Sequence, residues 1–572
     1  MERRLLIALA LTALVLILTP MFFPSSRTPQ RPAGRDTTRA AKAPADTRQA
    51  TRDTAPAPAR GIIAADSVEE PSTPSVGAAT LADTLVVRTP LAVYHFTSLG
   101  ARPIGATMLQ HPALGTGRNG FVQLARPGVP LVSYRLVVGS DTIPLDRVVF
   151  TVAGESAATL DTAAVARGAT PLTFRGALPT GGEAIISYSF VPDSHVVRVQ
   201  GEVTGTRAGP LLIRLPRGIQ SAEADSADDQ RHLAYVVKPV NDDARSVPFS
   251  KLEGKQRVEA GSFTWVASKT KYFLLSLLTP EGQTPFGAVT LVGGPESDRQ
   301  PVDADAVIAK PLSADGRFAF EIYAGPQEWR RLVAIGRDLE NANPYGGWLQ
   351  GFVQPFATIV MRMLLWMHDT LKLSYGWVLV IFGIAVRLIL WPLNQSAMRT
   401  SLRMQRIQPE LMEIQKRYRQ QPEKAHAEMM RVYKAHDLSP FSMFSGCLPM
   451  LLPMPVLFAL FFVFQNTIEF RGVSFLWLPD ISLKDPYYII PLIMGLSMYL
   501  LSWIGMRGVP PNPQTKMMAY VFPGFMTFLF LNFASGLNLY YAVQNIAALP
   551  QQWLIARERS KTGGATAPRS TS

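Results

Sequence analysis

The sequence predicts a polytopic α-helical membrane protein of six spans, with an all-β sandwich on the exported side and a helical hairpin in the cytoplasm. Three observations predict this fold class. Hydrophobic residues make up 47% of the 572 residues, and long apolar runs gather toward the C-terminal end. Short β-branched and aromatic runs fill the middle of the chain. Basic residues gather in alternate segments between the apolar runs, which indicates the topology.

The N-terminus carries two arginines before an apolar run, Leu5 to Phe23. This pattern is typical of a cleaved signal peptide or of a retained anchor. No clean small-residue cleavage site follows the run and no lipobox cysteine is present. We therefore expect residues 1–24 to form an uncleaved signal-anchor helix with its arginines in the cytoplasm. Residues 25–80 contain almost no large apolar residue, which predicts a disordered linker.

Residues 81–335 predict the exported all-β sandwich. Runs such as EAIISYSF and PLLIRLP are rich in β-branched and aromatic residues, and Gly, Pro, Asp and Asn separate such runs. Many of the runs alternate apolar with polar residues, as half-buried strands do. The histidines of this segment lie in no recognisable catalytic motif, so we expect no enzymatic role. A binding surface for carbohydrate or partner and a plain scaffold stay as alternatives.

Segment 345–372 is predicted to be an amphipathic helix on the exported membrane surface. Only about thirteen residues separate Pro355 from His368, fewer than a helical span needs. Arg362 lies among them, and tryptophans flank the segment. Such a short amphipathic helix is typical of the membrane interface.

Charges in the connecting segments give the direction of the remaining spans. Segment 395–440 has nine Lys or Arg against five Asp or Glu. Loop 507–516 and tail 557–572 are also basic, whereas loop 467–487 has more acids than bases. Positive loops stay in the cytoplasm, so both termini are expected there. A further span at 345–372 would place the basic segment 395–440 on the exported side of the membrane. The predicted spans after the first are 373–394, 446–466, 488–506, 517–533 and 536–556.

Segment 395–440 also predicts a helical hairpin. Apolar residues recur at steps of three and four in two stretches, one on each side of QQPEK. Pro422 is placed to begin the second helix, and we expect the helix that leaves the membrane to stop near Pro409. The basic outer face is either a solvated surface or a docking surface for an anionic partner. The first of the two apolar stretches forms a seam along one helix face, made of Met404, Ile407, Leu411, Ile414 and Tyr418.

Arg387 is the one charged residue in the apolar run FGIAVRLILWP. At 1.5 Å per residue it lies about 10 Å from the cytoplasmic end of its span. Its side chain can therefore reach the inner headgroups or face a wet cavity. Spans two to six contain no acidic residue, so no ion-pair partner is available within them. The candidate groove residues are Arg387, Gly383, Gln465, Asn538, Tyr541, Gln544 and Asn545.

Several long motifs follow one another in the C-terminal part. A basic hairpin comes after the Arg-bearing span, and then GCLPMLLPMPVLFALFFVF, DPYYIIPLIMGLSMYL and FPGFMTFLFLNFASGLNLYYAVQNIAALPQQWLI. Together they closely resemble the YidC/Oxa/Alb family of membrane protein insertases in its Gram-negative form. GRDLEN and YAGPQEW near the end of the β segment also fit. The resemblance implies that the β segment is periplasmic and that the chain is a multi-pass protein of the bacterial inner membrane.

The family resemblance also implies a mechanism. Spans two to six would form a groove that opens to the cytoplasm and to lipid and is closed to the periplasm. A nascent protein's polar flank would enter it, and Arg387 matches the groove arginine that would attract acidic residues of that flank. Tyr540 and Tyr541 match the family's paired tyrosines, and Tyr541 lies on the polar helix face. The apolar part of the client would slide along the third and fifth spans, at Leu457, Phe461, Phe525 and Leu529.

The partners implied by the resemblance are proteins and lipids. They include nascent membrane proteins, the Sec translocon with its associated proteins, and membrane lipids. Ribosome or signal-recognition components would meet the basic hairpin and tail. No sequence-specific nucleic-acid binding, cofactor or metal site is expected, because the sequence shows no ligand spacing for one.

Other classes of function fit the sequence less well. A secondary transporter would need matched repeats and paired half-helices. An intramembrane protease would need a nucleophile and a base within the spans, and spans two to six contain no histidine. An assembly chaperone without insertion activity stays as the alternative to an insertase.

Overall fold

A computed structural model of the chain describes residues 84–115, 120–153, 159–160, 171–252, 254–294, 303–343, 350–418, 420–435, 454–507 and 513–563. The expected signal-anchor helix and the expected linker lie outside these residues, as does the beginning of the expected third span. Strands dominate up to Pro326 and helices dominate after Trp329. The predicted division into a β-rich part and a helical part is therefore confirmed.

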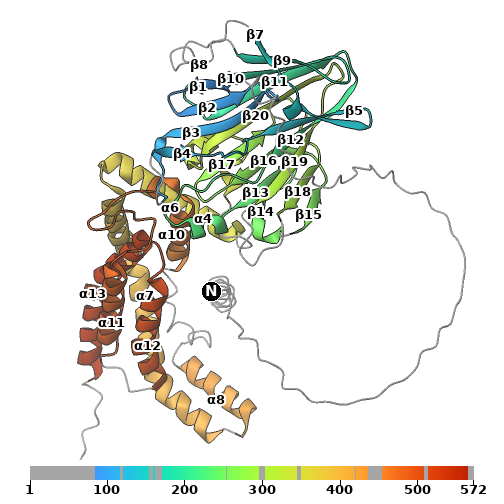
Figure 1. Cartoon of the computed structure of the whole chain (residues 1–572). Coiled ribbons are helices and arrows are strands. Elements are labelled where there is room, and N and C mark those ends of the chain that lie inside the picture. Colours follow the sequence, from blue (N-terminus) through green and yellow to red (C-terminus); the bar gives the residue numbers. More distant parts are fainter. Residues whose placement is uncertain are drawn as a thin grey trace, which may run out of the picture. The chain divides into compact units, whose positions relative to one another are not determined.

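The strands of the described residues form three sheets (Figure 1). The first, in spatial order, is β4 (Phe121–Gln123), β3 (Arg102–Pro112), β2 (Ala92–Thr97), β1 (Thr84–Arg88) and β8 (Thr159–Leu160). The second is β14 (Arg245–Pro248), β13 (Ala234–Pro239), β16 (Phe263–Lys269), β17 (Phe273–Leu278), β20 (Arg317–Pro326), β11 (Val196–Thr204), β10 (Glu183–Phe190), β9 (Leu172–Ala177) and β7 (Thr151–Ala153). The third is β15 (Gln256–Glu259), β18 (Val289–Gly293), β19 (Ala304–Lys310), β12 (Ala208–Leu215), β5 (Ser133–Val138) and β6 (Asp141–Pro144).

Alternating side chains explain how these sheets bury their apolar residues. The runs EAIISYSF and PLLIRLP form β10 and β12, as predicted, and buried residues alternate with less buried ones along both strands. The inward-facing residues of all three sheets join in one core. Within it the hydroxyl groups of Tyr134 and Tyr188 lie 2.9 Å apart, so these two buried hydroxyls pair with each other.

Strand β17 is buried on both faces, which explains its continuous apolar sequence FLLSLL. Phe273, Leu275 and Leu277 belong to the common core. Leu274 and Leu278 belong instead to a second cluster. Helix α5 (Trp329–Ile335) and the 3-10 turn η3 (Leu339–Ala342) contribute to this second cluster. They therefore cover the outer face of the sheet at β17.

Short helical segments interrupt the strands at three places. They are η1 (Leu145–Arg147), α4 (Ser226–Arg231) and η2 (Phe249–Lys251). Helix α4 begins at Asp225, whose carboxylate accepts a hydrogen bond from the backbone N–H of Asp228.

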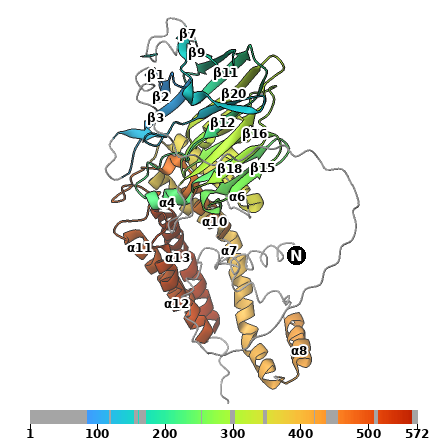
Figure 2. The same ribbon diagram turned by 45° about the vertical axis from the view of Figure 1, so that its right-hand side comes forward.

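The helical half consists of longer elements, drawn from yellow to red in Figure 1. They are α6 (Gln350–Leu371), α7 (Tyr375–Arg417), α8 (Pro422–Ala435), α10 (Met454–Asn466), η6 (Ile468–Phe470), α11 (Ile489–Gly505), α12 (Pro513–Phe530) and α13 (Ser535–Gly563). Helix α11 packs against both α12 and α13, and α13 also packs against α7. Figure 2 shows α11, α12 and α13 side by side.

One helical stretch of the described residues, Tyr375–Pro392, has the length and apolar composition needed to cross a membrane. Three shorter apolar stretches are Pro455–Asn466, Ile489–Gly505 and Ala519–Phe530. The predicted count of six spans thus stays a prediction. Many large apolar side chains on these helices are exposed, an arrangement that water would disfavour and lipid would accept. They include Trp377, Ile381, Leu388, Ile389, Leu492, Leu496, Val521, Phe525, Phe528 and Leu554.

Helix α6 occupies the segment for which an amphipathic interfacial helix was expected. Ala357, Met361 and Leu364 are buried against the helical core, and α6 packs on α10. Ile359 and Trp366 on the other face are exposed. The two faces of α6 are therefore distinct, but both carry apolar residues.

Helix α7 continues past position 409 without a break as far as Arg417. The expectation that this helix stops near Pro409 is therefore wrong. The apolar seam on both sides of that position explains the continuity, because Ile407 and Leu411 are both buried against Val432 of α8. This shared packing offsets the one backbone hydrogen bond that a proline removes. Figures 1 and 2 show α8 folded back beside the end of α7.

Candidate functional site

The candidate site is built where α7 approaches α13. Gly383 lies one turn before Arg387 on α7, on the same helix face. A Cβ atom at Gly383 would lie 3.1 Å from Cγ1 of Val543 on α13. Only a glycine allows this close approach without a shift of the neighbour, so Gly383 lets the two helices come into contact. Arg387 then lies beside α13 rather than at a distance from it.

Arg387 is half-buried and is held by a residue from the far end of the chain. Its Nη2 atom donates a hydrogen bond to Oε1 of Gln551, at 2.8 Å. Nε2 of Gln551 in turn donates to the backbone oxygen of Trp391, at 3.2 Å. Gln551 is only 3% exposed. The amide of Gln551 thus bridges the guanidinium and the α7 backbone one turn further on.

Two of the expected groove residues on α13 lie in different surroundings. Nε2 of Gln544 donates to the hydroxyl of Tyr540 at 2.8 Å and to the backbone oxygen of Gly383 at 3.4 Å. Nδ2 of Asn538 donates to the backbone oxygen of Phe530, at 2.9 Å. Gln544 therefore faces α7, whereas Asn538 joins the beginning of α13 to the end of α12.

Tyr541 stacks on Phe530, with ring centroids 5.7 Å apart. Asn545 is buried. No hydrogen bond joins Arg387 to Asn538, Tyr541 or Asn545 in the described part of the chain. The structure therefore brings Arg387, Gly383 and Gln544 together, while Asn538 and Tyr541 line the α12 side of the same helix.

Several polar atoms of this region are buried without a hydrogen-bond partner among the described residues. They are Nε of Arg387, Oδ1 of Asn538 and Nδ2 of Asn545. An unpaired buried polar group costs about 1–3 kcal/mol, so such groups are usually satisfied by protein or by water.

The charge of Arg387 is not neutralised within the described residues, where no carboxylate lies within ion-pair distance of it. Its partner Gln551 is uncharged. The site therefore combines one positive charge with neutral amides and hydroxyls, which suits attraction of an anionic group.

The expected slide residues divide between buried and exposed positions. On α10, Leu457 is buried in the helical core, and Phe461 is half-buried with its ring against Phe462 and Phe533. On α12, Phe525 is exposed and Leu529 is half-buried. Of the four expected slide residues, Phe525 on α12 is thus exposed, whereas Leu457 on α10 is buried. Gln465, near the end of α10, is half-buried.

Gln551 was not among the residues selected from the sequence. A signal for it exists, because Gln544 and Gln551 are seven residues apart and so lie on one face of α13. The predicted span 536–556 includes Gln551, but helical periodicity alone does not show that this end of the helix meets Arg387.

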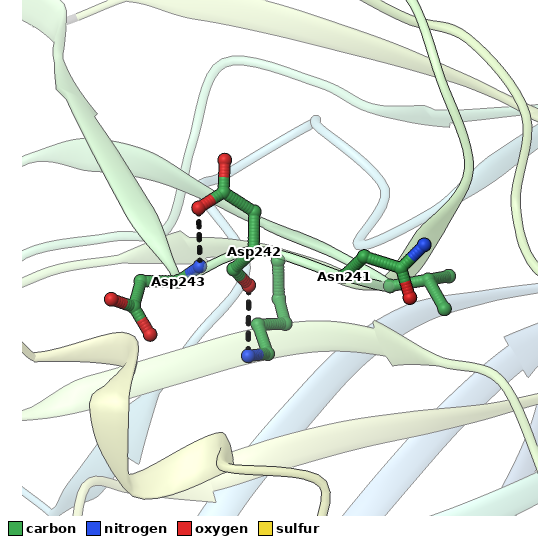
Figure 3. Close-up of a pocket in the computed structure, with 5 residues that line it drawn as sticks. Asn241, Asp242 and Asp243 are labelled. Carbon is green, nitrogen blue, oxygen red and sulfur yellow. Dashed lines mark hydrogen bonds between the residues drawn. The ribbon is translucent and has the colours of Figure 1, made fainter.

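A separate hollow of about 270 Å³ lies beside the turn between β13 and β14 (Figure 3). Two of the charged side chains that line it, Lys238 and Asp242, are engaged in contacts of their own. Nζ of Lys238 donates to the backbone oxygen of Asp242 at 2.9 Å and pairs with Asp338 at 3.1 Å. Asp242 also binds Arg245. Since these contacts stabilise the turn, we assign this hollow no ligand.

Among the described residues no group of three His, Cys, Asp or Glu side chains is arranged to hold a metal ion.

Two family models match the chain. The model described as 60Kd inner membrane protein covers residues 366–562, and the model described as YidC periplasmic domain covers residues 84–359. Together they include both the helical half and the β-rich half.

Curated relatives named membrane protein insertase YidC match over much of the chain. The protein of Anaeromyxobacter dehalogenans is 32% identical over 308 residues, 54% of each chain. The chain thus spans about half the length of this relative. The protein of Pelodictyon phaeoclathratiforme is 30% identical over 425 residues, 69% of this chain and 70% of the relative.

Two solved structures are also similar. A crystal structure of an active YidC insertase with its first transmembrane domain resolved covers 83% of this chain and 95% of its own, at 18% identity and a TM-score of 0.33. A galactose mutarotase-like protein from Lactobacillus casei covers 42% of this chain and 99% of its own, at 10% identity and a TM-score of 0.28.

Proposed function

The chain belongs to the YidC family of membrane protein insertases, and we propose that it inserts nascent proteins into the bacterial inner membrane and helps them fold. Arg387 supports this function most directly. It places a charge without a carboxylate partner within the described stretch that is apolar and long enough to span a membrane. A structural arginine in lipid would usually be paired, so this one suits transient contact with a polar client.

The proposed topology has six spans with both termini in the cytoplasm and the β-rich half in the periplasm. Helices α7, α10, α11, α12 and α13 supply spans two to six, and α6 lies on the periplasmic membrane surface. Helices α7 and α8 form a hairpin in the cytoplasm. The exposed apolar side chains of α7, α11 and α12 support contact with lipid. The basic residues of segment 395–440 support the cytoplasmic side for the hairpin.

In the proposed mechanism a client's polar flank enters, from the cytoplasm, a groove formed by spans two to six, with Arg387 beside the contact between α7 and α13. Arg387 attracts its acidic side chains, and the water and polar groups of the groove offer hydrogen bonds to its backbone. Polar backbone in hydrocarbon is costly without such partners. The client's apolar segment then leaves along the exposed face of α12, at Phe525 and Leu529, with Phe461 and Leu457 of α10 behind it.

The proposed partners follow from this mechanism and from the charges outside the spans. Nascent membrane proteins are the clients, and the Sec translocon with its associated proteins works beside the chain. Ribosome or signal-recognition components dock on the basic hairpin and tail, and lipids surround the spans. No cofactor takes part, and the chain is not an enzyme.

Reconstitution into vesicles that contain no other protein tests the function. The client has one apolar segment and a short acidic tail, and protection of the tail from external protease measures insertion. We expect protection with the parent chain and a reduction of about tenfold for Arg387→Ala, since electrostatic focusing in a low-dielectric cleft is worth at least that much. Arg362→Ala on α6, where the guanidinium lies 4.8 Å from the ring centre of Trp329, is the matched control.

The alternative function is that of an assembly chaperone without insertion activity. Such a protein would bind the client but leave its tail unprotected in these vesicles. Photo-crosslinking from positions 541 and 525 to a stalled nascent chain detects that binding separately. Binding without tail protection would exclude the insertase and favour the chaperone.

A further inference from the structure

Gln551 fixes the way in which Arg387 is presented at the contact between α7 and α13. We propose that Gln551 is a positioning residue that sets the preference of the insertion site for acidic client tails, an inference that rests on the proposed insertase function. The role has two parts, orientation of the guanidinium and preservation of its charge.

Orientation follows from the two hydrogen bonds of the Gln551 amide. Its Oε1 accepts from Nη2 of Arg387 at 2.8 Å, and its Nε2 donates to the backbone oxygen of Trp391 at 3.2 Å. Because one bond uses the oxygen and the other the nitrogen, only one orientation of the amide satisfies both. The buried side chain of Gln551 is thus anchored to α7 and holds the guanidinium in one place.

A held guanidinium cannot extend freely along its own helix. An arginine in an apolar helix ordinarily directs its charge toward the nearest headgroups. The bond to Gln551 holds the charge of Arg387 against α13. Its Nε atom is enclosed without a hydrogen-bond partner among the described residues, so only the outer part of this half-buried side chain can meet another ligand.

Preservation of the charge follows from the neutrality of the amide. A glutamate has nearly the same shape as a glutamine and could take the same place beside Nη2. It would form a charge-assisted pair with Arg387 and cancel its positive charge. Glutamine supplies the acceptor atom without the negative charge. The positive charge of Arg387 therefore stays available to an acidic tail.

The next residue on α13 offers a matched control. Gln552 is half-buried on a different face of the helix, where a Cβ atom at Gly505 of α11 would lie 2.6 Å from its Nε2 atom. Gln552→Glu therefore adds the same charge one residue away, beside α11 instead of beside Arg387.

The experiment uses the full chain in vesicles and two clients that differ only in the translocated tail, which carries two Asp or two Asn. The measured quantity is the ratio of insertion of the acidic client to that of the neutral client. Both clients are measured in the same vesicles, so any loss of folded protein cancels in this ratio. The variants are Gln551→Glu, Gln551→Met and Gln552→Glu.

We expect the parent chain and Gln552→Glu to favour the acidic tail by about fivefold to tenfold, as focusing of one charge in a cleft allows. The ratio should fall to about one for Gln551→Glu, because the charge is cancelled, and to an intermediate value for Gln551→Met, because the charge remains but is no longer held. A parent-like ratio in Gln551→Glu would overturn the inference, as would an equal fall in Gln552→Glu. Failure of the parent chain to insert either client would instead overturn the proposed function, and this inference with it.

Discussion

Glu469 illustrates how one buried carboxylate can make stability depend on pH. It lies in η6, just after the end of α10, in the loop proposed to face the periplasm. Burial raises the pKa of this carboxyl to about 7, and the nearby Glu328 carboxylate adds to the increase. The folded state therefore holds the Glu469 proton more tightly than the unfolded chain does.

The consequence is a loss of stability as pH rises. Between the ordinary pKa of a glutamate, about 4.3, and the folded value of about 7, the folded state binds more protons, so the free energy of unfolding falls with increasing pH. We expect Glu469→Gln to raise the free energy of unfolding at pH 8 by up to about 3 kcal/mol. At pH 5 the same substitution should change it little, because the carboxyl is then neutral in the folded state. Thermal melting at the two pH values measures this. The exposed Glu281→Gln is the control, and equal effects at both pH values would contradict the assignment to Glu469.

At the scale of the element, the start of α11 depends on a single aspartate, Asp485. Asp485 is 0% exposed. One of its oxygens accepts from the backbone N–H of Ile490 at 2.8 Å and the other from that of Tyr487 at 3.0 Å. Nε1 of Trp477 approaches the same carboxylate at 3.3 Å. Tyr488 between them has φ of +57°, a left-handed conformation that costs about 1–2 kcal/mol. Asp485 helps to hold it there.

We expect Asp485→Ala to destabilise the helical half by about 2–4 kcal/mol, because it leaves donors at the helix start unpaired. Asp485→Asn keeps the shape and one acceptor oxygen, so its loss should be smaller. Thermal melting in detergent compares the two with the exposed Lys484→Ala. If alanine and asparagine gave the same small change as Lys484→Ala, the carboxylate would not be what secures this helix.

The hairpin of α7 and α8 has a small core of its own. Ile407, Leu411, Val432 and Tyr433 are buried together, and no other cluster of the described residues shares them. We expect Leu411→Ala to cost roughly 2 kcal/mol and to loosen this hairpin alone.

Hydrogen exchange followed by peptide should detect the effect of Leu411→Ala. Exchange should accelerate in residues 407–433 and stay unchanged in the β-strands. Met412→Ala, at an exposed neighbour, should leave both regions as they are. Faster exchange throughout the chain would show that the hairpin core is not independent.

At the scale of the whole molecule, a buried ion pair joins the β-rich half to the loop after α10. Nε of Arg471 donates to both carboxylate oxygens of Glu223, at 2.9 and 2.8 Å. The two side chains are 3% and 8% exposed. The guanidinium also lies 5.6 Å from the ring centre of Phe273 in β17. Nδ2 of Asn343 adds a second link through the backbone oxygen of Asn466, at 3.4 Å.

We expect Arg471→Ala to destabilise the protein by about 3–5 kcal/mol, because it leaves a buried carboxylate without its counter-charge. The double variant Arg471→Met with Glu223→Gln removes both charges and should recover most of that loss. Thermal unfolding of the full chain measures both. A double variant no more stable than Arg471→Ala would mean that packing, and not the unpaired charge, accounts for the loss.

Local sequence patterns were sufficient for the division into a β-rich and a helical part and for the first residue of the site. Alternation over EAIISYSF predicts β10, and the apolar run around Arg387 predicts the first part of α7. Such patterns depend on residues within a few positions of one another, as the geometry of strands and helices does. The expectation of a break at Pro409 was wrong because it too used only local sequence. Contacts with α8, which no local pattern reports, stabilise the continuous helix there.

The sequence by itself determined which segments are strands and helices and that a lone charge lies in an apolar helix. Only the tertiary structure decided what that charge meets. Gln551 is 164 positions from Arg387, and Glu223 is 248 positions from Arg471. Contacts over such separations depend on how closely two elements pack, as at Gly383, where the missing side chain lets α13 approach α7. That closeness is a property of the folded core, to which side chains from many distant positions contribute at once.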